Sequence, residues 1–208
     1  GMVLTDDERL WRRAVLFHDV AAGLRQGMPA DEIVWGINFR MPELLAAVML
    51  VQLERLDGLL ESMRQRKRML KAGIEDVARS RGVVFQDVPD PEGDASIALI
   101  FFVESEERSR RVAEALRAEN ISVWELYRPE RVDFHVYRHW IPIMNQRTWT
   151  PQGGPWRWAR REIRYSPDMC PRSLDLLGRA VHVDVNPLLT NQDIEETIEG
   201  INKVLRAL

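Results

Sequence analysis

The sequence predicts an α+β protein in which a sheet, with helices on one of its faces, follows a long helical segment. Up to about residue 81, apolar residues recur mainly at helical spacing. Beyond that point, short β-branched and apolar runs alternate with two further helical stretches. Helices gathered on one face of an antiparallel or mixed sheet define this class. We therefore expect two parts, a helical segment over residues 1–82 and an α+β domain over residues 83–208.

The first part should contain two helices joined by a connection. Thr5 followed by Glu8 has the pattern of a capping box, which would open a helix running to about Leu24. Pro42 suits the first turn of the second helix. Residues 44–53 of that helix are apolar almost all round, which is typical of a helix buried on several sides. We expect it to pack against a second domain or a second subunit.

The composition of the helical sequence changes from apolar to charged after Asp57-Gly58. Residues 61–81 are highly charged and carry only an apolar stripe, which predicts a solvated surface helix that stops near Gly82. The stripe consists of Leu60, Met63, Leu70 and Ile74.

The second part should supply the strands. The candidates are 83–85, 95–103, 121–124 and 180–185, of which the second reads as buried and the last as half-buried. Ser105 should cap a helix running to Ala118, with Asn120 as its stop. Pro187 and Thr190 introduce a final helix with one apolar face.

Residues 129–171 form a long irregular insertion with many arginines and aromatic residues. A loop of this length in a compact domain is usually functional or disordered, and its tryptophans argue against disorder. Arginine and tryptophan side chains suit binding to a nucleotide or a phosphate group of a ligand. The tyrosines and tryptophans among them are Tyr137, Trp140, Trp149, Trp156, Trp158 and Tyr165.

Composition excludes several classes of protein. A net charge of -3 argues against nucleic-acid binding, and no apolar run approaches the length of a membrane span. The acidic start at residues 5–8 is unlike a secretory leader, so we expect a cytoplasmic protein. The single cysteine, Cys170, excludes an internal disulfide. We expect no metal site, because His135, His139, His182 and Cys170 lie in separate segments.

Asn38 and Arg40 are the candidate binding residues. They alternate with Ile37 and Phe39, so they share one face if the segment is extended. An amide and a guanidinium just before a helix N-terminus suit a phosphate or a carboxylate. The alternative is that Asn38 is a turn or cap residue and Arg40 forms a surface ion pair.

Four stretches resemble the DegT/DnrJ/StrS family of pyridoxal-phosphate (PLP) sugar aminotransferases. Residues 36–47 (GINFRMPELLAA) followed by 52–57 (QLERLD) are similar to the family's most specific motif. Residues 2–7 (MVLTDD) resemble the segment that follows the PLP lysine, and residues 179–194 resemble the family's closing strand and helix. Residues 165–173 (YSPDMCPRS) resemble one subgroup only.

The resemblance implies the small C-terminal domain of a fold-type I PLP aminotransferase, preceded by a long interface helix. In such a dimer, the residue matching Asn38 reaches the PLP phosphate of the neighbouring subunit, and the residue matching Arg40 lies at the shared active site. The reaction implied moves an amino group from an amino acid to a keto-sugar or cyclitol, so a sugar or sugar nucleotide is the implied ligand.

The lysine that holds PLP as a Schiff base is not found among the residues that match the family. Only Lys67, Lys71 and Lys203 are present, and all three read as exposed surface residues. The chain is therefore expected to be the truncated C-terminal part of an aminotransferase, inactive alone and without bound PLP. Its partners would be a second copy or a lysine-bearing N-terminal partner. The alternative is a non-catalytic binding or assembly module, a degenerate remnant.

Overall fold

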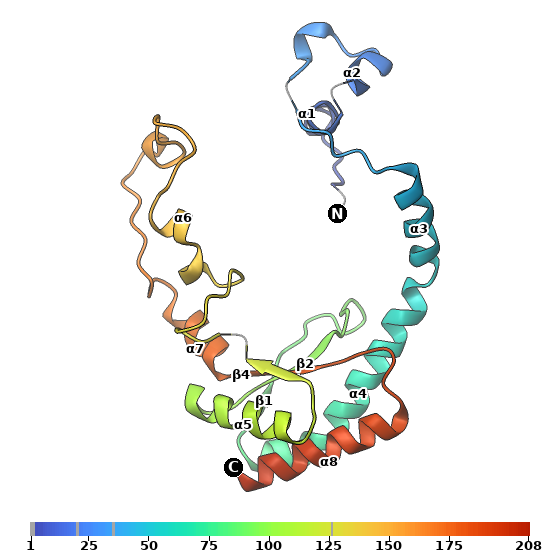
Figure 1. Ribbon diagram of the computed structural model, residues 1–208, viewed down its shortest axis with the longest axis vertical. Coiled ribbons are helices and arrows are strands. Elements are labelled where there is room, and N and C mark those ends of the chain that lie inside the picture. The colour runs from blue at the N-terminus through green and yellow to red at the C-terminus, as the bar shows by residue number, and fades with distance from the viewer. Residues whose placement is uncertain (1–2, 20, 35, 126) are drawn as a thin grey trace. The chain divides into compact units, whose positions relative to one another are not determined.

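The computed structural model describes residues 3–19, 21–34, 36–125 and 127–208, and only the backbone of Ala22 and Leu24. Met2, at the start of the predicted 2–7 motif, lies outside the described residues. The chain divides into two compact units, Gly1–Asp57 and Gly58–Leu208, which are called unit 1 and unit 2 below (Figure 1).

Unit 1 is helical. It contains α1 (Glu8–His18), α2 (Ala22–Arg25), the 3₁₀ turn η1 (Ala30–Glu32) and α3 (Glu43–Glu54). The predicted capping box is wrong, because Asp7 is the N-cap of α1 and accepts from the N–H groups of Arg9 (2.8 Å) and Leu10 (3.0 Å). The single helix predicted to reach Leu24 is also wrong. Asp19 adopts an extended conformation that ends α1, and α2 is a separate turn.

The helix α3 leaves its apolar side chains exposed within unit 1. Pro42 precedes the helix in an extended conformation and does not lie in its first turn as predicted. None of the α3 residues is buried, and Leu44 and Leu50 are 78% and 61% exposed. Unit 1 therefore does not itself cover the apolar surface of this helix.

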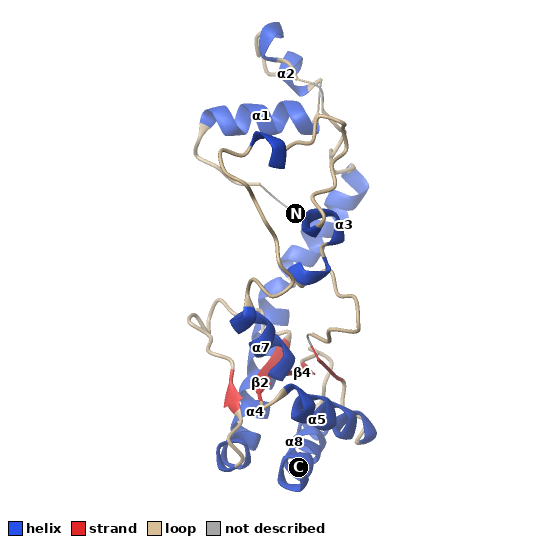
Figure 2. Cartoon of the chain, turned by 90° about the vertical axis from the view of Figure 1, so that its left-hand side faces the viewer, coloured by secondary structure: helices blue, strands red, loops and turns tan. Residues whose placement is uncertain are grey.

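Unit 2 is built on an antiparallel sheet. Its strands are β1 (Val84–Phe85), β2 (Ala98–Phe102), β3 (Val123–Glu125) and β4 (Ala180–Asp184), in the order β1-β2-β4-β3. β4 pairs with both β2 and β3, with Val181 opposite Phe101 and His182 opposite Trp124. The predicted α+β class is confirmed, and strands and the larger helices gather in this unit (Figure 2).

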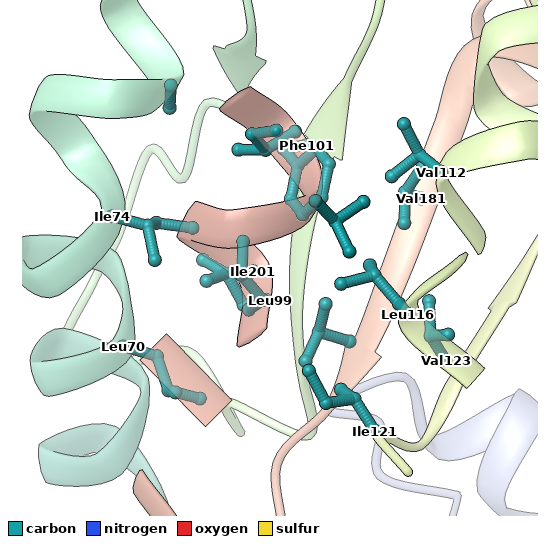
Figure 3. Packing of buried hydrophobic residues seen from close by; sticks show 14 of the residues in the cluster. Leu70, Ile74, Leu99, Phe101, Val112, Leu116, Ile121, Val123, Val181 and Ile201 are labelled. Atoms are coloured by element: carbon teal, nitrogen blue, oxygen red, sulfur yellow. The ribbon is translucent and has the colours of Figure 1, made fainter. Parts of the chain in front are cut away.

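Three helices share one core with the sheet. They are α4 (Leu56–Ser80), α5 (Glu106–Ala118) and α8 (Asn191–Ala207). Figure 3 shows Ile74 of α4, Leu116 of α5 and Ile201 of α8 gathered around Phe101 and Val181 of the sheet. Of the stripe predicted on α4, Leu70 and Ile74 lie in the core and Met63 packs against it, whereas Leu60 is half-buried outside it. The helix therefore packs with unit 2, although the sequence groups it with the first part. The remaining core residues include Leu70, Leu99, Val112, Val183, Ile194 and Leu205.

The caps of the helices in unit 2 follow the sequence. The Ser105 side chain accepts from the N–H of Arg108 (3.1 Å) at the start of α5, and Thr190 and Asp193 form a capping box on α8. Asn120 ends α5 with a positive φ of 63°, a conformation that asparagine tolerates better than most residues.

Residues 129–171 hold only short helical turns. These are η2 (Tyr137–His139), α6 (Ile141–Met144) and η3 (Trp156–Trp158), after which α7 (Pro171–Arg179) leads into β4. The sequence did not predict α7. Trp149 is fully exposed and Trp158 largely so, so aromatic surface is presented outward. Among the described residues, no helix is both long and apolar enough to cross a membrane.

Candidate functional site

The segment that carries the predicted site residues is fixed to the end of α1. The Ile37 N–H donates to the Phe17 carbonyl (2.9 Å), and the Phe39 N–H donates to the His18 carbonyl (3.0 Å). A Cβ atom on Gly36 would lie 2.1 Å from the Phe17 carbonyl oxygen, so only glycine permits this approach. The two hydrogen bonds set the register of residues 36–40.

Asn38 and Arg40 lie together just before α3. The Asn38 Oδ1 atom accepts from the Arg40 backbone N–H (3.0 Å), and the Arg40 Nε atom lies 3.3 Å from Asp19 Oδ2. These are the turn and the ion pair that the simpler interpretation of the sequence expects. Both side chains remain exposed. Among the described residues, neither the Asn38 amide nitrogen nor the terminal nitrogens of Arg40 make a hydrogen bond.

Asp19 also contributes to this site, although no pattern in the sequence indicated it. Its side chain is 10% exposed, accepts hydrogen bonds from the Ala21 N–H (3.1 Å) and from Arg25, and forms an ion pair with Arg40. Burial acts to raise the Asp19 pKa, but the Ala21 N–H and the charges of Arg25 and Arg40 outweigh it and hold the pKa below its ordinary value. Asp19 is therefore an ionised carboxylate that anchors one edge of the Arg40 guanidinium.

The site has the donors that an anion requires. The amide nitrogen of Asn38 donates two hydrogen bonds, and the terminal nitrogens of Arg40 present a planar pair of donors. Both stand beside the N-terminus of α3, where unpaired N–H groups favour negative charge. This donor set fits a phosphate or a carboxylate, including the phosphate of a cofactor such as PLP.

The three lysines lie elsewhere, in unit 2, and each has a partner. Lys67 Nζ lies 2.5 Å from Asp94 Oδ2, and Lys203 Nζ lies 2.8 Å from Glu119 Oε1. Lys71 Nζ stands 5.3 Å from the centre of the Phe85 ring. Lys67 is only 14% exposed, so its expected placement as a solvated surface lysine is wrong. A carboxylate or a ring face stabilises the protonated amine and not the neutral amine that attacks an aldehyde.

The histidines do not converge either. His135 is exposed and pairs with Asp133, whereas His139 is buried and its Nδ1 accepts from the Asp133 N–H (2.8 Å). His182 is buried on β4, with its ring edge-on to Trp124 at 4.7 Å. Cys170 is exposed. In the part of the chain that the structure describes, no three His, Cys, Asp or Glu side chains form a metal-binding group.

The fold is mixed α+β, with an antiparallel sheet and helices. Residues 1–150 match the model of the DegT/DnrJ/EryC1/StrS aminotransferase family, and the chain belongs to this family.

Solved structures show the same fold. A DegT/DnrJ/EryC1/StrS aminotransferase from Brucella abortus superposes with a TM-score of 0.61 at 22% identity, over 96% of this chain and 44% of that one. A 3-amino-5-hydroxybenzoic acid synthase gives 0.65 at 20% identity, over 99% and 50%. A putative sugar aminotransferase from Streptococcus pneumoniae, in its PMP form, gives 0.63 at 16% identity, over 100% and 46%. The chain therefore spans about half the length of these proteins.

Proposed function

We propose that this chain supplies part of the active site of a PLP-dependent aminotransferase that acts on a keto-sugar or cyclitol. In this proposal Asn38 donates to the PLP phosphate, and Arg40 binds an anionic group of the cofactor or the substrate. The observation that carries the proposal is segment 36–40, which two backbone hydrogen bonds fix to the end of α1 and whose Asn38 and Arg40 side chains are exposed ahead of α3. PLP, when bound, supplies the electron sink that amino-group transfer needs.

The lysine of the complete site would come from outside the residues of this chain. Lys67, Lys71 and Lys203 are each engaged in unit 2, and none neighbours Asn38 or Arg40 in sequence. Either a longer form of the chain or a separate polypeptide would provide the amine. The chain alone is then expected to be inactive and to bind PLP without covalent attachment or not at all.

We further propose that α3 packs against a second subunit. Its side chains are apolar on every face and exposed within unit 1, and apolar surface of this extent marks an interaction site. A second copy of the chain would bring two such helices together. This arrangement also suits a site to which one subunit gives Asn38 and Arg40 and its neighbour gives the lysine.

The insertion 129–171 is proposed to contact the sugar or its nucleotide. A hollow of about 720 Å³ opens within it, lined among others by Trp156, Arg157, Arg164 and Tyr165. The Trp156 indole N–H donates to the Tyr165 hydroxyl (3.0 Å), which holds the two rings together at one wall. Aromatic faces and guanidinium groups suit sugar rings and phosphates respectively.

Complementation tests the proposal. The purified chain is mixed with a lysine-bearing N-terminal aminotransferase part, and transamination and PLP binding by equilibrium dialysis are measured for each part and for the mixture. We expect activity only in the mixture, and weaker PLP binding in Asn38→Ala. The matched control is Asn186→Ala, because Asn186 is also exposed and its Oδ1 accepts from the Leu188 N–H (2.9 Å) in the same kind of turn.

Two results would overturn the proposal. One is covalent capture of PLP by the chain alone, traced by borohydride reduction to Lys67, Lys71 or Lys203. The other is equal PLP affinity in mixtures that contain Asn38→Ala, Arg40→Ala or the unaltered chain. A mixture that binds PLP but never transaminates would favour a non-catalytic module.

A further inference from the structure

We propose that Asp19 is a positioning residue, which holds the Arg40 guanidinium in the orientation that binds an anion. The inference rests on the proposed function, because it assumes that Arg40 acts at the active site. Asp19 touches no substrate in this proposal and acts only through Arg40.

The placement of Asp19 is not explained by the stability of α1. Asp19 is the C-cap of that helix, and its N–H donates to the Val15 carbonyl (3.1 Å). A carboxylate at the C-terminus of a helix faces the negative end of the helix dipole, which disfavours it. Asp19 is also largely withdrawn from water, which adds to the cost. Arg25 and Arg40 compensate for both effects.

The contact leaves Arg40 free to bind. Asp19 takes the Nε edge of the guanidinium at 3.3 Å, so the two terminal nitrogens can face a ligand. The backbone of Arg40 is also held in place, because its N–H donates to Asn38 Oδ1. The N–H of the preceding residue, Phe39, donates to the His18 carbonyl. Arginine loses much rotamer freedom when it binds an anion, and a side chain that is already held loses less.

Arg25 provides an internal control. Its guanidinium reaches the same oxygen of Asp19, Oδ2, as Arg40 does. Removing Arg25 keeps the Asp19–Arg40 pair and alters only the packing of α2 and the local charge. If Asp19 served merely to tie down α2, then Arg25→Gln and Asp19→Asn would have the same consequences.

For Asp19→Asn, simple electrostatics and the positioning role predict opposite changes in affinity for the anion. Asp19→Asn removes a negative charge close to the proposed anion site, which by Coulomb attraction alone should strengthen anion binding. Loss of the anchor for Arg40 should weaken it. The direction of the change in affinity therefore separates the two effects.

The experiment measures the Kd of PLP by equilibrium dialysis in the complemented holoenzyme. We expect Asp19→Asn to raise the Kd about tenfold, which corresponds to about 1.4 kcal/mol. Asp19→Glu should restore part of the affinity, and Arg25→Gln should leave the Kd within about twofold, or about 0.4 kcal/mol. In an Arg40→Ala background, Asp19→Asn should have no further effect, because the residue that it positions is gone.

Each outcome decides one question. If Arg40→Ala binds PLP like the unaltered protein and leaves KM for both substrates unchanged, the proposed role of Arg40 fails. If Arg40→Ala weakens binding but Asp19→Asn does not, or strengthens it, only the positioning role fails. If Asp19→Asn weakens binding equally with Arg40 present or absent, Asp19 is merely structural and the inference is overturned.

Discussion

The helices of unit 2 bury their apolar side chains, whereas α3 of unit 1 leaves its apolar side chains exposed. In unit 2, α4, α5 and α8 bury their apolar faces against one side of the sheet, and Phe101, Val181 and Ile201 are fully buried. In unit 1, α3 is the most apolar helix and none of its residues is buried. The contrast shows that the sheet and helices of unit 2 cover one another's apolar faces. The sequence of α3 suits a partner beyond unit 1.

The largest expected effect is a cavity in the core of unit 2. Phe101→Ala should lower the free energy of unfolding by about 3–5 kcal/mol, because the ring is fully buried between the sheet and the helices. Leu50→Ala in α3 should cost less than about 0.5 kcal/mol in the monomeric chain, because Leu50 is exposed there. Urea denaturation at low protein concentration, followed by circular dichroism, measures both. Equal losses of unfolding free energy in the two variants would show that the two units do not differ in how they bury apolar side chains.

The second prediction concerns association through α3. Leu50→Glu should weaken self-association at least about tenfold, or about 1.4 kcal/mol, because it places a charge in the proposed interface. Leu188→Glu is the matched control, since Leu188 is an exposed leucine of unit 2. Sedimentation velocity over a concentration series measures the dissociation constant. An unaltered chain that stays monomeric at high concentration would refute the interface itself.

The third prediction compares two helix caps. Thr190→Ala should destabilise unit 2 by about 1 kcal/mol, because it removes the hydroxyl oxygen that accepts from the Asp193 N–H at the start of α8. Asp7→Ala removes the cap of α1 in unit 1, and should leave the unfolding of the unit 2 core unchanged. Hydrogen exchange at the amides of α1 and α8 distinguishes the effects of these two substitutions. Lost protection of α8 in Asp7→Ala would show that the units unfold together.

Much of unit 2 could be predicted from the sequence because its signals are local. Ser105 and Thr190 cap the helices that they were expected to cap, and Asn120 ends α5. The alternation in residues 180–185 also predicted the position of β4, but the expectation of a half-buried strand is wrong, because Ala180, Val181, His182 and Val183 are all buried. The order of the strands was not predictable, because it depends on pairing between residues far apart in the chain.

The candidate site could be predicted only in part. Asn38 and Arg40 lie in one short motif, and the structure joins them by the Arg40 N–H and Asn38 Oδ1, the turn that the simpler interpretation expects. Asp19 lies at the end of a different helix, and no periodicity or spacing relates it to Arg40. The helix predicted to reach Leu24 would have contained Asp19, so no sequence signal marked this carboxylate as a residue at a helix end.

The smallest expected effect is a pH dependence confined to unit 2. Burial of His182 lowers its pKa below the ordinary value of 6.5, with Lys67 acting in the same direction and Asp184 opposing it. The unfolded chain therefore binds a proton more readily than the folded chain. The stability contributed by the neutral ring is complete above pH 6.5 and is lost as the pH falls through the folded pKa.

His182→Phe should remove this dependence, because phenylalanine keeps the ring beside Trp124 and cannot titrate. We expect urea denaturation to show a smaller fall in stability between pH 7.5 and pH 5.5 for this variant than for the unaltered chain. An unchanged slope in His182→Phe would mean that water reaches the ring in solution. In that case the sheet face that carries His182 would be as open as α3, and burial would distinguish the two units less sharply.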